Sequence, residues 1–292
     1  MKKMVIAGAA LVSLAVPAAA ADLPLKAPPR AVVAAYDWNG FYAGVNVGYS
    51  WGRAETDPRA TEQVQVFRGV PPVLPVLADT GVVGAGLGIA RADVNGVIGG
   101  LQAGWNWQRG TWLFGLETDF QWSGEHGSSA VAFTIPALVV PQAGGTVPAL
   151  AGALTADTRL KWFGTLRPRA GVLVTDRWLL YVTGGLAYGR LDSTYTAGLT
   201  GFGAFASTVS TTKAGWTVGV GAEGALWGNW TAKVEYLYMD LGSVTGGGIA
   251  GTVTASNVPA IGFSTVTTVT AAPTTKFTDN IFRVGLNYRF AH

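Results

Sequence analysis

The sequence contains no cysteine and only two histidines among its 292 residues. Without thiols the chain can form no disulfide, no catalytic cysteine and no thiolate metal site. Charged residues are scarce as well, at 13%. The two longest uncharged segments, 131–156 and 241–275, are interrupted by prolines and glycines. Neither is the steady apolar run of ~20 residues that a membrane-spanning helix needs, so the composition argues against a helical membrane protein.

The first residues are not part of the expected fold. Lys2 and Lys3 precede the apolar stretch "MVIAGAALVSLAV", and small residues follow it. This order is typical of a secretory signal peptide, which we expect to cover residues 1–21 and to be cleaved after Ala20 or Ala21. Without those two lysines, the 20 basic residues fall to 18 against 17 acidic ones, a net charge of +1. The sequence therefore predicts an exported bacterial protein with no basic surface for nucleic acid.

Apolar and polar residues alternate along much of the chain, most clearly in "TWLFGLETDFQW" at 111–122. Tryptophan, phenylalanine and leucine dominate one face there, while Glu117, Asp119 and Gln121 lie on the other. A period of two residues predicts a β-strand with one apolar and one polar face. By the same pattern we expect eight strands, at 41–53, 93–107, 111–123, 158–174, 178–191, 213–227, 230–241 and 278–290.

The connections between these strands alternate in length. "QRG", "TDR" and "GN" are turns of two or three residues. The other gaps run to roughly 20–40 residues each, at 54–92, 124–157, 192–212 and 242–277. This pattern predicts an all-β fold, an eight-stranded, antiparallel, up-and-down transmembrane β-barrel with short periplasmic turns and four long outer loops. Residues 38–292 form the barrel domain in this interpretation, and residues 22–37 form a Pro/Ala-rich periplasmic linker.

The positions of the charges agree with a barrel in lipid. If the tryptophan faces point outward, outward positions carry charge only at Arg53, Asp93, Arg190 and Asp240, each at the loop end of its strand. A charge that faces the middle of the bilayer costs up to ~2–4 kcal/mol. Inward charges must pair or stay hydrated. We predict a polar core in the lumen formed by Glu117, Asp119, Arg167, Arg169, Glu223, Lys233, Glu235, Arg283 and Arg289.

The aromatic residues of the outward face gather at the two ends of the strands. Two bands of aromatic rings at the membrane interfaces are typical of such barrels. In the core of a soluble β-sandwich, aromatic residues would also occupy the middles of the strands. We expect the interfaces to hold Trp51, Trp105, Trp112, Trp122, Trp162, Trp178, Trp216, Trp230, Tyr288 and Phe290.

Several segments also form a familiar set: "ADLPLKAPP", "WNGFYAGVNVGYSWG", "GGLQAGWNWQ", "WLFGLETDFQWS", "LRPRAGVL", "WLLYVTGGLAYG" and "VEYLYMDLG". Together they resemble the alphaproteobacterial family of small immunogenic outer-membrane β-barrels, which are often described as porin-like or opacity-type surface antigens. The resemblance covers every expected strand and the linker, but not the loops. It implies an eight-stranded barrel with a structural or surface role in a Gram-negative outer membrane, and it brings no catalytic site with it.

Two polar motifs could carry chemistry, and we interpret both as structural. The segment 219–224 fits the G-x-G-x-x-G pattern of dinucleotide sites, but it lies inside an alternating strand instead of opening a helix. Glu125, His126, Ser128 and Ser129 could in principle form a triad-like group, although a solvated loop start explains them better. The group is also too sparse for a metal site. We expect no enzyme activity, no cofactor and no metal.

Three functions stay open. The first, which we favour, is a structural and surface-exposed role in the envelope. The second is a small porin of low conductance, because many inward positions are glycine and leave space either for arginine side chains or for water. The third is an adhesin or ligand receptor built on the outer loops, whose apolar surface is typical of contact sites, unless those segments prolong the hairpins. The expected partners are outer-membrane lipids and, through linker or loops, the cell wall or a host surface.

The last expected strand, "IFRVGLNYRF", ends the chain except for Ala291 and His292. We predict that it pairs with 41–53 and closes the barrel. An aromatic-rich last strand that ends in phenylalanine resembles the signal read by the outer-membrane insertion machinery. That signal usually stops at the phenylalanine, so the two additional residues depart from it.

Overall fold

The computed structural model describes residues 36–57, 59–68, 75–77, 82–86, 88–135, 137–140, 145–147, 149–200, 203–246, 249–258 and 263–290. The expected signal peptide, most of the expected linker, and Ala291 and His292 lie outside these residues. Eight long strands run antiparallel to their neighbours: β1 (Gly40–Asp57), β5 (Ala90–Arg109), β6 (Trp112–Ile135), β9 (Leu150–Thr175), β10 (Trp178–Leu199), β11 (Gly203–Ala225), β12 (Trp230–Thr245) and β15 (Thr274–Arg289).

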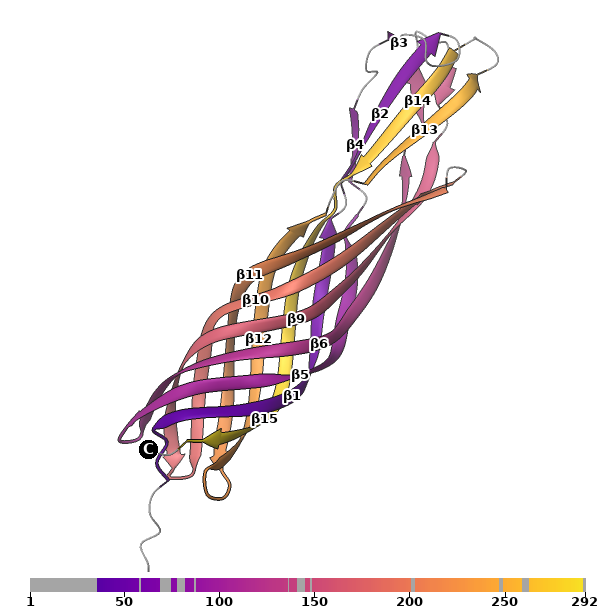
Figure 1. Cartoon of the computed structure of the whole chain (residues 1–292). Coiled ribbons are helices and arrows are strands. Elements are labelled where there is room, and N and C mark those ends of the chain that lie inside the picture. Colours follow the sequence, from indigo (N-terminus) through magenta and orange to yellow (C-terminus); the bar gives the residue numbers. More distant parts are fainter. Residues whose placement is uncertain are drawn as a thin grey trace, which may run out of the picture. The chain divides into compact units, whose positions relative to one another are not determined.

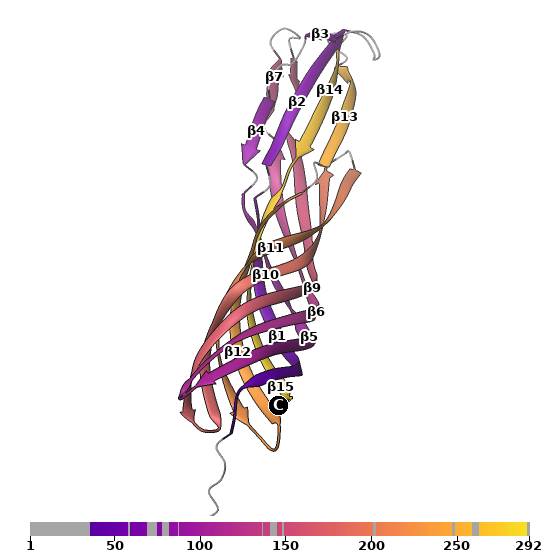
Figure 2. The same ribbon diagram turned by 60° about the vertical axis from the view of Figure 1, so that its left-hand side comes forward.

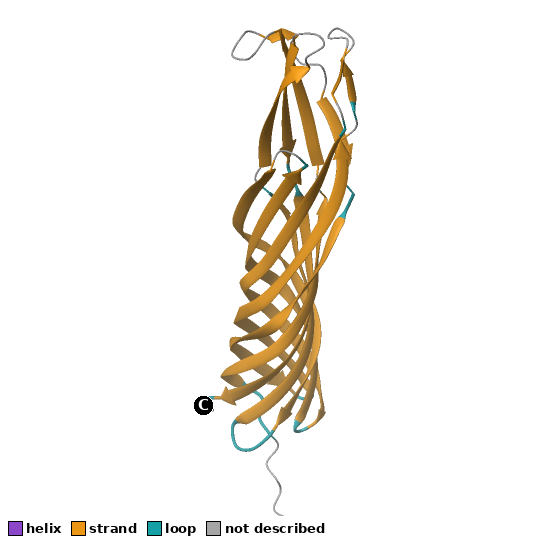
Figure 3. Ribbon diagram, turned by 90° about the vertical axis from the view of Figure 1, so that its right-hand side faces the viewer, coloured by secondary structure: helices purple, strands orange, loops and turns teal. Residues whose placement is uncertain are grey.

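These eight strands form a closed barrel in the order β1-β15-β12-β11-β10-β9-β6-β5, so the predicted fold is confirmed. Figures 1 and 3 show the strands winding around it. The last strand, β15, pairs with the first, from Tyr42↔Arg289 to Asp57↔Thr274. Closure gives every barrel strand two neighbours, so that backbone groups in the part of the barrel near the short turns do not lie at a free sheet edge. No helix among the described residues is long and apolar enough to span a membrane.

The strands are longer than the sequence pattern predicts. β6 continues to Ile135 and β9 begins at Leu150. The ladder between the two strands extends to the pair Ile135↔Leu150. Much of the segment expected as the second outer loop is therefore a prolonged hairpin. The residues concerned are largely Ala, Val, Thr and Ser. Because valine and threonine fit a pleated sheet, strand formation there is consistent with the composition, although few large residues mark the alternation.

The segments expected as the first and fourth loops also contain strands, and these pair with each other. β2 (Arg59–Arg68) pairs with β14 (Phe263–Ala271), which in turn pairs with β13 (Ile249–Val258). β3 (Pro75–Leu77) and β4 (Val82–Gly86) both pair with β2, as Figure 2 shows for β4. β7 (Leu138–Val140) and β8 (Gly145–Val147) form a small hairpin. Two loops far apart in the sequence thus share one sheet.

β11 differs from the other barrel strands in its pairing. It pairs with β10 over its whole length, from Gly203 to Gly224, but its ladder with β12 covers only Trp216 to Ala225. Among the described strands, residues 203–215 pair with β10 alone. In this outer part of the hairpin, backbone pairing thus joins β11 to one neighbour, although Val209 packs against the apolar core of the interior.

Along the part of the barrel near the short turns, apolar side chains face outward. Val45, Val97 and Leu101 are each more than half exposed, whereas Arg167 and Arg283 are completely buried. A soluble protein would reverse these faces, because exposed apolar surface of this extent is unfavourable in water. This half of the barrel therefore has the surface of a protein that lies in lipid.

Toward the other end of the barrel, which we call the loop end, the two faces exchange their character. Arg53, Arg91 and Arg190 lie on the outer face there, while the interior holds an apolar core. The buried residues of this core are Ala54, Ala92, Val94, Ile98, Leu160, Phe163, Ala187, Leu191, Leu237, Met239, Leu241, Val244, Phe277 and Ile281. The expectation of a polar lumen thus holds for only part of the interior. Where a strand leaves the lipid, water favours polar groups outside and the interior can be apolar.

Candidate functional site

The middle of the barrel interior holds eight ionisable side chains, which we call the central ion-pair cluster. Each is at most 3% exposed: Glu117 and Asp119 on β6, Arg167 and Arg169 on β9, Glu223 on β11, Lys233 and Glu235 on β12, and Arg283 on β15. Six of them come as pairs two residues apart in one strand, and this spacing places both side chains on the same face. The structure thus brings together eight of the nine residues of the predicted polar core.

Arg167 is at the centre of the cluster. Its Nη2 donates hydrogen bonds to Oε1 of Glu117 at 2.7 Å and to Oδ2 of Asp119 at 3.0 Å. Its Nη1 donates to Oε1 of Glu235 at 3.2 Å, across the barrel interior. A planar guanidinium with several donors suits this arrangement better than an ammonium would. One arginine therefore binds three carboxylates from two strands.

Two further cations bind the same carboxylates from other directions. Arg283 donates from Nε to Oε2 of Glu235 at 2.7 Å and from Nη2 to Oδ2 of Asp119 at 2.9 Å. Lys233 donates from Nζ to Oε1 of Glu117 at 2.7 Å. Each of these three carboxylates thus contacts at least two cations, which compensates for the loss of hydration that burial imposes.

Arg169 lies between two tyrosine rings at the edge of the cluster. Its guanidinium carbon is 4.7 Å from the ring centroid of Tyr42 and 5.2 Å from that of Tyr181, within the range of a cation–π contact. The hydroxyl of Tyr42 donates to Oε2 of Glu117 at 2.6 Å, and that of Tyr181 donates to Glu235 at 3.1 Å. Neither tyrosine belongs to the predicted polar core, because the alternation of apolar and polar residues does not distinguish an inward tyrosine from an outward aromatic residue.

Neutral side chains extend this network on the side of Glu223. That carboxylate accepts hydrogen bonds from Arg169 Nη1 at 3.0 Å, from Asn287 Nδ2 at 2.9 Å and from the Thr231 hydroxyl at 2.5 Å. Asn287 accepts in turn from Gln102 Nε2 at 2.5 Å. The cluster balances four cations against four carboxylates, and the amides satisfy much of its remaining hydrogen-bonding capacity.

The end of the barrel with the short turns, the turn end, is filled by Trp38, which precedes β1. The Trp38 side chain is completely buried and packs with Leu113 and Leu179. Its Nε1 donates to the carbonyl oxygen of Asp176 at 3.2 Å, and its backbone N–H donates to Oε1 of Gln108 at 3.0 Å. The boundary residue of the predicted barrel domain thus folds back into the interior.

Arg289, the ninth residue of the predicted polar core, lies at this turn end. Its Nη2 donates to the carbonyl oxygen of Asn39 at 2.9 Å, and its guanidinium carbon is 4.6 Å from the ring centroid of Tyr36. The ring of Tyr36 meets that of Trp38 edge-on at 5.0 Å. Burial raises the pKa of Tyr36, so that its phenol stays neutral. Arg289 therefore connects the segment before β1 with the last strand through a hydrogen bond and a cation–π contact.

Near the loop end, three polar side chains interrupt the apolar core. The hydroxyl of Ser50 donates to Oδ1 of Asp279, and Glu125 contacts both residues. Glu125 and Asp279 are buried. Neither carboxylate belongs to the predicted polar core, because Glu125 lies in an expected loop and Asp279 at the start of its expected strand. These carboxylates form a second, smaller polar group in the interior.

The aromatic residues expected at the membrane interfaces lie on the outer surface of the barrel. Eight are exposed: Trp51, Trp105, Trp112, Trp122, Trp178, Trp216, Tyr288 and Phe290. Trp162 and Trp230 are half-buried against neighbours, since Trp162 stacks on Phe120 at 5.6 Å and Trp230 meets Tyr288 at 5.1 Å. Their contact with lipid headgroups stays a prediction.

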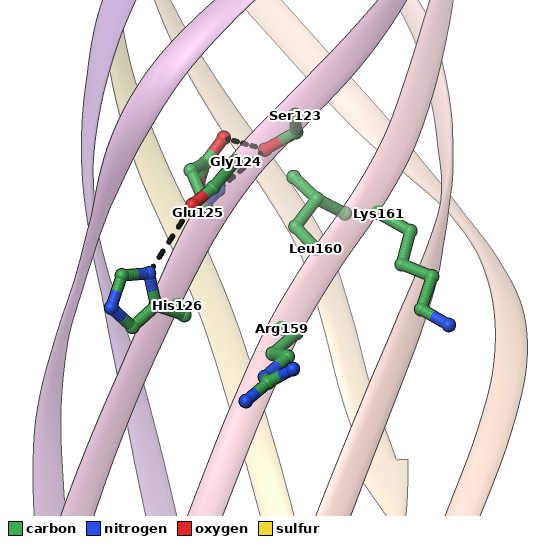
Figure 4. A pocket seen from close by; sticks show the side chains of 7 residues that line it. All are labelled: Ser123, Gly124, Glu125, His126, Arg159, Leu160 and Lys161. Carbon is green, nitrogen blue, oxygen red and sulfur yellow. Dashed lines mark hydrogen bonds between the residues drawn. The ribbon is translucent and has the colours of Figure 1, made fainter.

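The triad-like group considered in the sequence is not assembled as a catalytic site. His126 is exposed, and its Nδ1 lies 3.3 Å from the carbonyl oxygen of Gly124. Glu125 is buried and accepts a 3.0 Å hydrogen bond from Ser123. Adjacent residues of a strand point to opposite faces, so the carboxylate and the imidazole lie apart (Figure 4). Within the described part of the chain, no group of three or more His, Asp or Glu residues is placed to hold a metal ion.

Several solved outer-membrane proteins are similar to the chain. Ail, the attachment invasion locus protein of Yersinia pestis, is 11% identical and matches 82% of this chain and 99% of that one, with a TM-score of 0.27. OprG of Pseudomonas aeruginosa is 12% identical and matches 86% of this chain and 97% of that one, with a TM-score of 0.36. Similarity at this level adds nothing to the strand pairing described above.

The sequence comparisons are more informative. The family pattern described as "Outer membrane protein beta-barrel domain" matches residues 6–290. The "31 kDa outer-membrane immunogenic protein" of Brucella melitensis is 36% identical over 253 residues, which cover 83% of this chain and 88% of that protein. The "22 kDa outer membrane protein" of Rhizobium leguminosarum is 30% identical over 142 residues, 49% of this chain and 51% of that protein.

These matches agree with the exposed apolar face of the closed barrel, and they place the protein in the bacterial outer membrane. They also agree with the motifs that run through the barrel strands. The chain therefore belongs to the outer-membrane β-barrel family, in its alphaproteobacterial branch of immunogenic proteins.

Proposed function

We propose that this protein is a non-enzymatic, structural barrel that is closed to solutes and presents its outer hairpins at the cell surface. The observation that carries the proposal is the central ion-pair cluster, in which Arg167 binds carboxylates from β6 and β12 inside the barrel. Cations and carboxylates that contact each other directly across the interior occupy space that a continuous path for water would need.

The inward glycines support the same conclusion. The sequence left open whether they make room for side chains or for water. A Cβ added at Gly104 would meet the ring and hydroxyl of Tyr42, and one added at Gly221 would meet those of Tyr181. At Gly115 the space holds the side chains of Asn106 and Arg169. The volume that these glycines leave is therefore filled by protein atoms, which argues against the porin alternative.

Both ends of the interior support a closed barrel as well. The apolar core near the loop end and the Trp38 side chain at the turn end are buried. An ion that crosses the barrel would have to displace both of them, and dehydration in apolar surroundings makes that passage unfavourable. The closed state thus does not depend on the ion pairs alone.

The surface role rests on the relatives and on the outer strands. The Brucella relatives are named immunogenic outer-membrane proteins, and an antigen must present part of its chain to the outside. In this chain, the prolonged hairpins and the sheet formed by β2, β13 and β14 are the segments available for that role. Among the residues that the structure describes, no particular contact favours an adhesin function.

Planar-bilayer recording of the refolded full chain tests closure. We expect no discrete conductance steps from protein whose folding is verified by its heat-dependent gel mobility. Regular single-channel steps from the folded band would contradict the proposal. A liposome-swelling assay with small sugars provides an independent measurement and should show no uptake above that of protein-free vesicles.

The structural role is tested in cells that lack the protein. We expect such cells to be more sensitive to detergent and to release more periplasmic protein. The wild type and the His126→Ala variant should restore the envelope equally well, because a structural barrel needs no imidazole. Failure of His126→Ala to restore it, together with altered lipid A, would favour an enzyme instead.

A further inference from the structure

A bulge in β9 distinguishes one site on the outer surface. Trp162 is the partner of both Trp122 on β6 and Arg190 on β10, while Leu160 is the next paired residue on β9 in both ladders. Lys161 is therefore left without a partner residue on either side. Extra residues of this kind re-aim side chains, and they are frequent at the rims of barrels and beside functional sites. Here Lys161 is exposed and Trp162 next to it contacts outer-face aromatic rings.

A pocket of about 380 Å³ opens at this bulge. Its lining is formed by Ser123, Gly124, Glu125, His126, Arg159, Leu160 and Lys161, shown in Figure 4. His126 and Arg159 are partners across the β6–β9 ladder. Both are exposed, as is Lys161. Three nitrogen-bearing side chains from two strands therefore belong to the lining of one open pocket on the outer face.

Positively charged side chains around the pocket outnumber the carboxylates that pair with them. Lys161 Nζ lies 2.7 Å from Oδ2 of Asp192, and Arg190 Nε lies 3.4 Å from Oδ1 of the same residue. One carboxylate is thus shared by two cations. In the described part of the chain, no carboxylate forms an ion pair with Arg159. The lining also contains the buried carboxylate of Glu125. Three cations thus stand against two carboxylates, and the positive charge in excess attracts an anion.

The position of the pocket along the barrel indicates which anion. Immediately below it lies a group of outer-face rings, in which Phe120 contacts Trp122 at 5.2 Å and Trp162 at 5.6 Å. Aromatic rings of this kind mark the interface between hydrocarbon and headgroups. The lining begins at Ser123, one residue beyond Trp122 on β6, and reaches His126, roughly 9 Å beyond Trp122 along a strand tilted by ~45°. The headgroup layer, roughly 5–8 Å thick on each side of a bilayer, falls within this span. The pocket is therefore at headgroup depth.

The exchange of polarity along the strands supports the same depth. Below the pocket the outward residues are apolar. At the level of the pocket, Arg159 and Arg190 lie on the outer face, and the next residues, Leu160 and Leu191, face the interior. A surface that changes from apolar to basic within a few residues fits the amphipathic form of a lipid with an anionic headgroup. A soluble anion would have no need for the aromatic surface directly beneath.

We propose that His126, Arg159 and Lys161, flanked by Arg190, form a binding site for a phosphate group of a phosphorylated glycolipid in the outer leaflet. Arg159 presents a guanidinium that can bind two phosphate oxygens at once, and Lys161 supplies a second charge. Trp122 and Trp162 contact the upper acyl chains of the same lipid. The site extends the general expectation of lipid partners to particular residues and to one headgroup chemistry.

The test uses the full chain refolded in detergent and titrated with bis-phosphorylated lipid A, with bound lipid counted by native mass spectrometry. The variant is R159Q/K161Q. The matched control is R53Q/R91Q, which removes two arginines from the outer face of β1 and β5 at the loop end. We expect R159Q/K161Q to weaken lipid binding about 30-fold, as two basic residues at a membrane surface should, and R53Q/R91Q to bind within about threefold of the wild type.

Three outcomes decide the proposal, each with folding verified by heat-dependent gel mobility. Dephosphorylated lipid A should bind the wild type as weakly as lipid A binds R159Q/K161Q, which would assign the phosphate to this pocket. Equal weakening in R53Q/R91Q would overturn the proposal, because the attraction would then be a general property of the basic surface. Displacement of lipid A by millimolar inorganic phosphate would also overturn it, since the pocket would then bind a free anion.

Discussion

The hydroxyl of Tyr42 and Oε2 of Glu117 are joined by a 2.6 Å hydrogen bond between β1 and β6. β5 lies between these two strands in the barrel, so the bond crosses the interior instead of following the ladder. Glu117 also binds Arg167 and Lys233, from β9 and β12. Contacts of this kind form only when strands from both halves of the sequence have come together, which makes the interior a product of barrel closure.

Replacement of Arg167 should be strongly destabilising. Arg167→Met leaves Glu117, Asp119 and Glu235 buried with fewer cations, and loss of one partner of a buried ion pair costs ~3–5 kcal/mol. Unfolding in urea, followed by tryptophan fluorescence of the protein in lipid vesicles, measures the change. Arg190→Met is the matched control, because the Arg190 side chain is 47% exposed and its loss should change stability by less than ~0.5 kcal/mol. Equal effects of the two substitutions would refute a structural role for the cluster.

Trp38 should contribute to stability although it lies outside the strands. Trp38→Ala removes a completely buried ring and its hydrogen bond to Asp176, and such truncations cost ~3–5 kcal/mol. The same urea titration gives the value. Trp227→Ala, in a turn where the ring is 65% exposed, should leave the midpoint almost unchanged. A small effect of Trp38→Ala would mean that the segment before β1 contributes little to the closed barrel.

Gly48 should not tolerate a larger residue. A Cβ at this position would meet the carbonyl oxygen of Phe282 and the Cβ of Arg283 on the neighbouring β15. We expect Gly48→Ala to lower stability by about 2–3 kcal/mol, because crowding in a packed interior forces backbone shifts. A Cβ added at Gly198 would meet no atom within 4 Å, so Gly198→Ala should be neutral in the same assay. Folding yields of the two variants provide a second comparison.

Phe290 should be required for assembly, whereas the two residues after it should not. Its backbone N–H donates to the carbonyl oxygen of Phe41 at 2.9 Å, and the two rings are 5.5 Å apart. We predict that Phe290→Ala reduces the amount of folded protein in outer-membrane fractions, because it weakens the aromatic end of the last strand. Deletion of Ala291 and His292 should leave the amount unchanged. Normal assembly of Phe290→Ala would show that the insertion machinery does not depend on this side chain.

The fold and the middle of the interior could be predicted because one physical rule governs both. Lipid on the outside makes the outward residues apolar, and inward charges such as Glu117 and Arg167 must then be paired. The rule does not apply to strand ends outside the lipid. There Leu160 faces the interior and Lys161 faces outward, so alternation persists while its polarity is reversed.

Other contacts had no local signal at all. Trp38 precedes the first strand, and nothing in its neighbours indicates that it enters the barrel, because its partner Asp176 is 138 residues away. The bulge at Lys161 is defined by register on both sides of β9, a property of strand pairs that a single pattern does not contain. Contacts between residues far apart in the sequence therefore determine the position of Trp38 and the bulge at Lys161, which the alternation of apolar and polar residues does not predict.

The one-sided attachment of β11 has a consequence for how this surface can change over time. Because residues 203–215 pair only with β10 among the described strands, residues can be inserted or deleted in pairs at the end of that hairpin without shifting any other register. The number of strands and the stagger that closes the barrel are unaffected by such changes. Evolution can therefore vary the length of this exposed hairpin while the part embedded in the membrane stays the same.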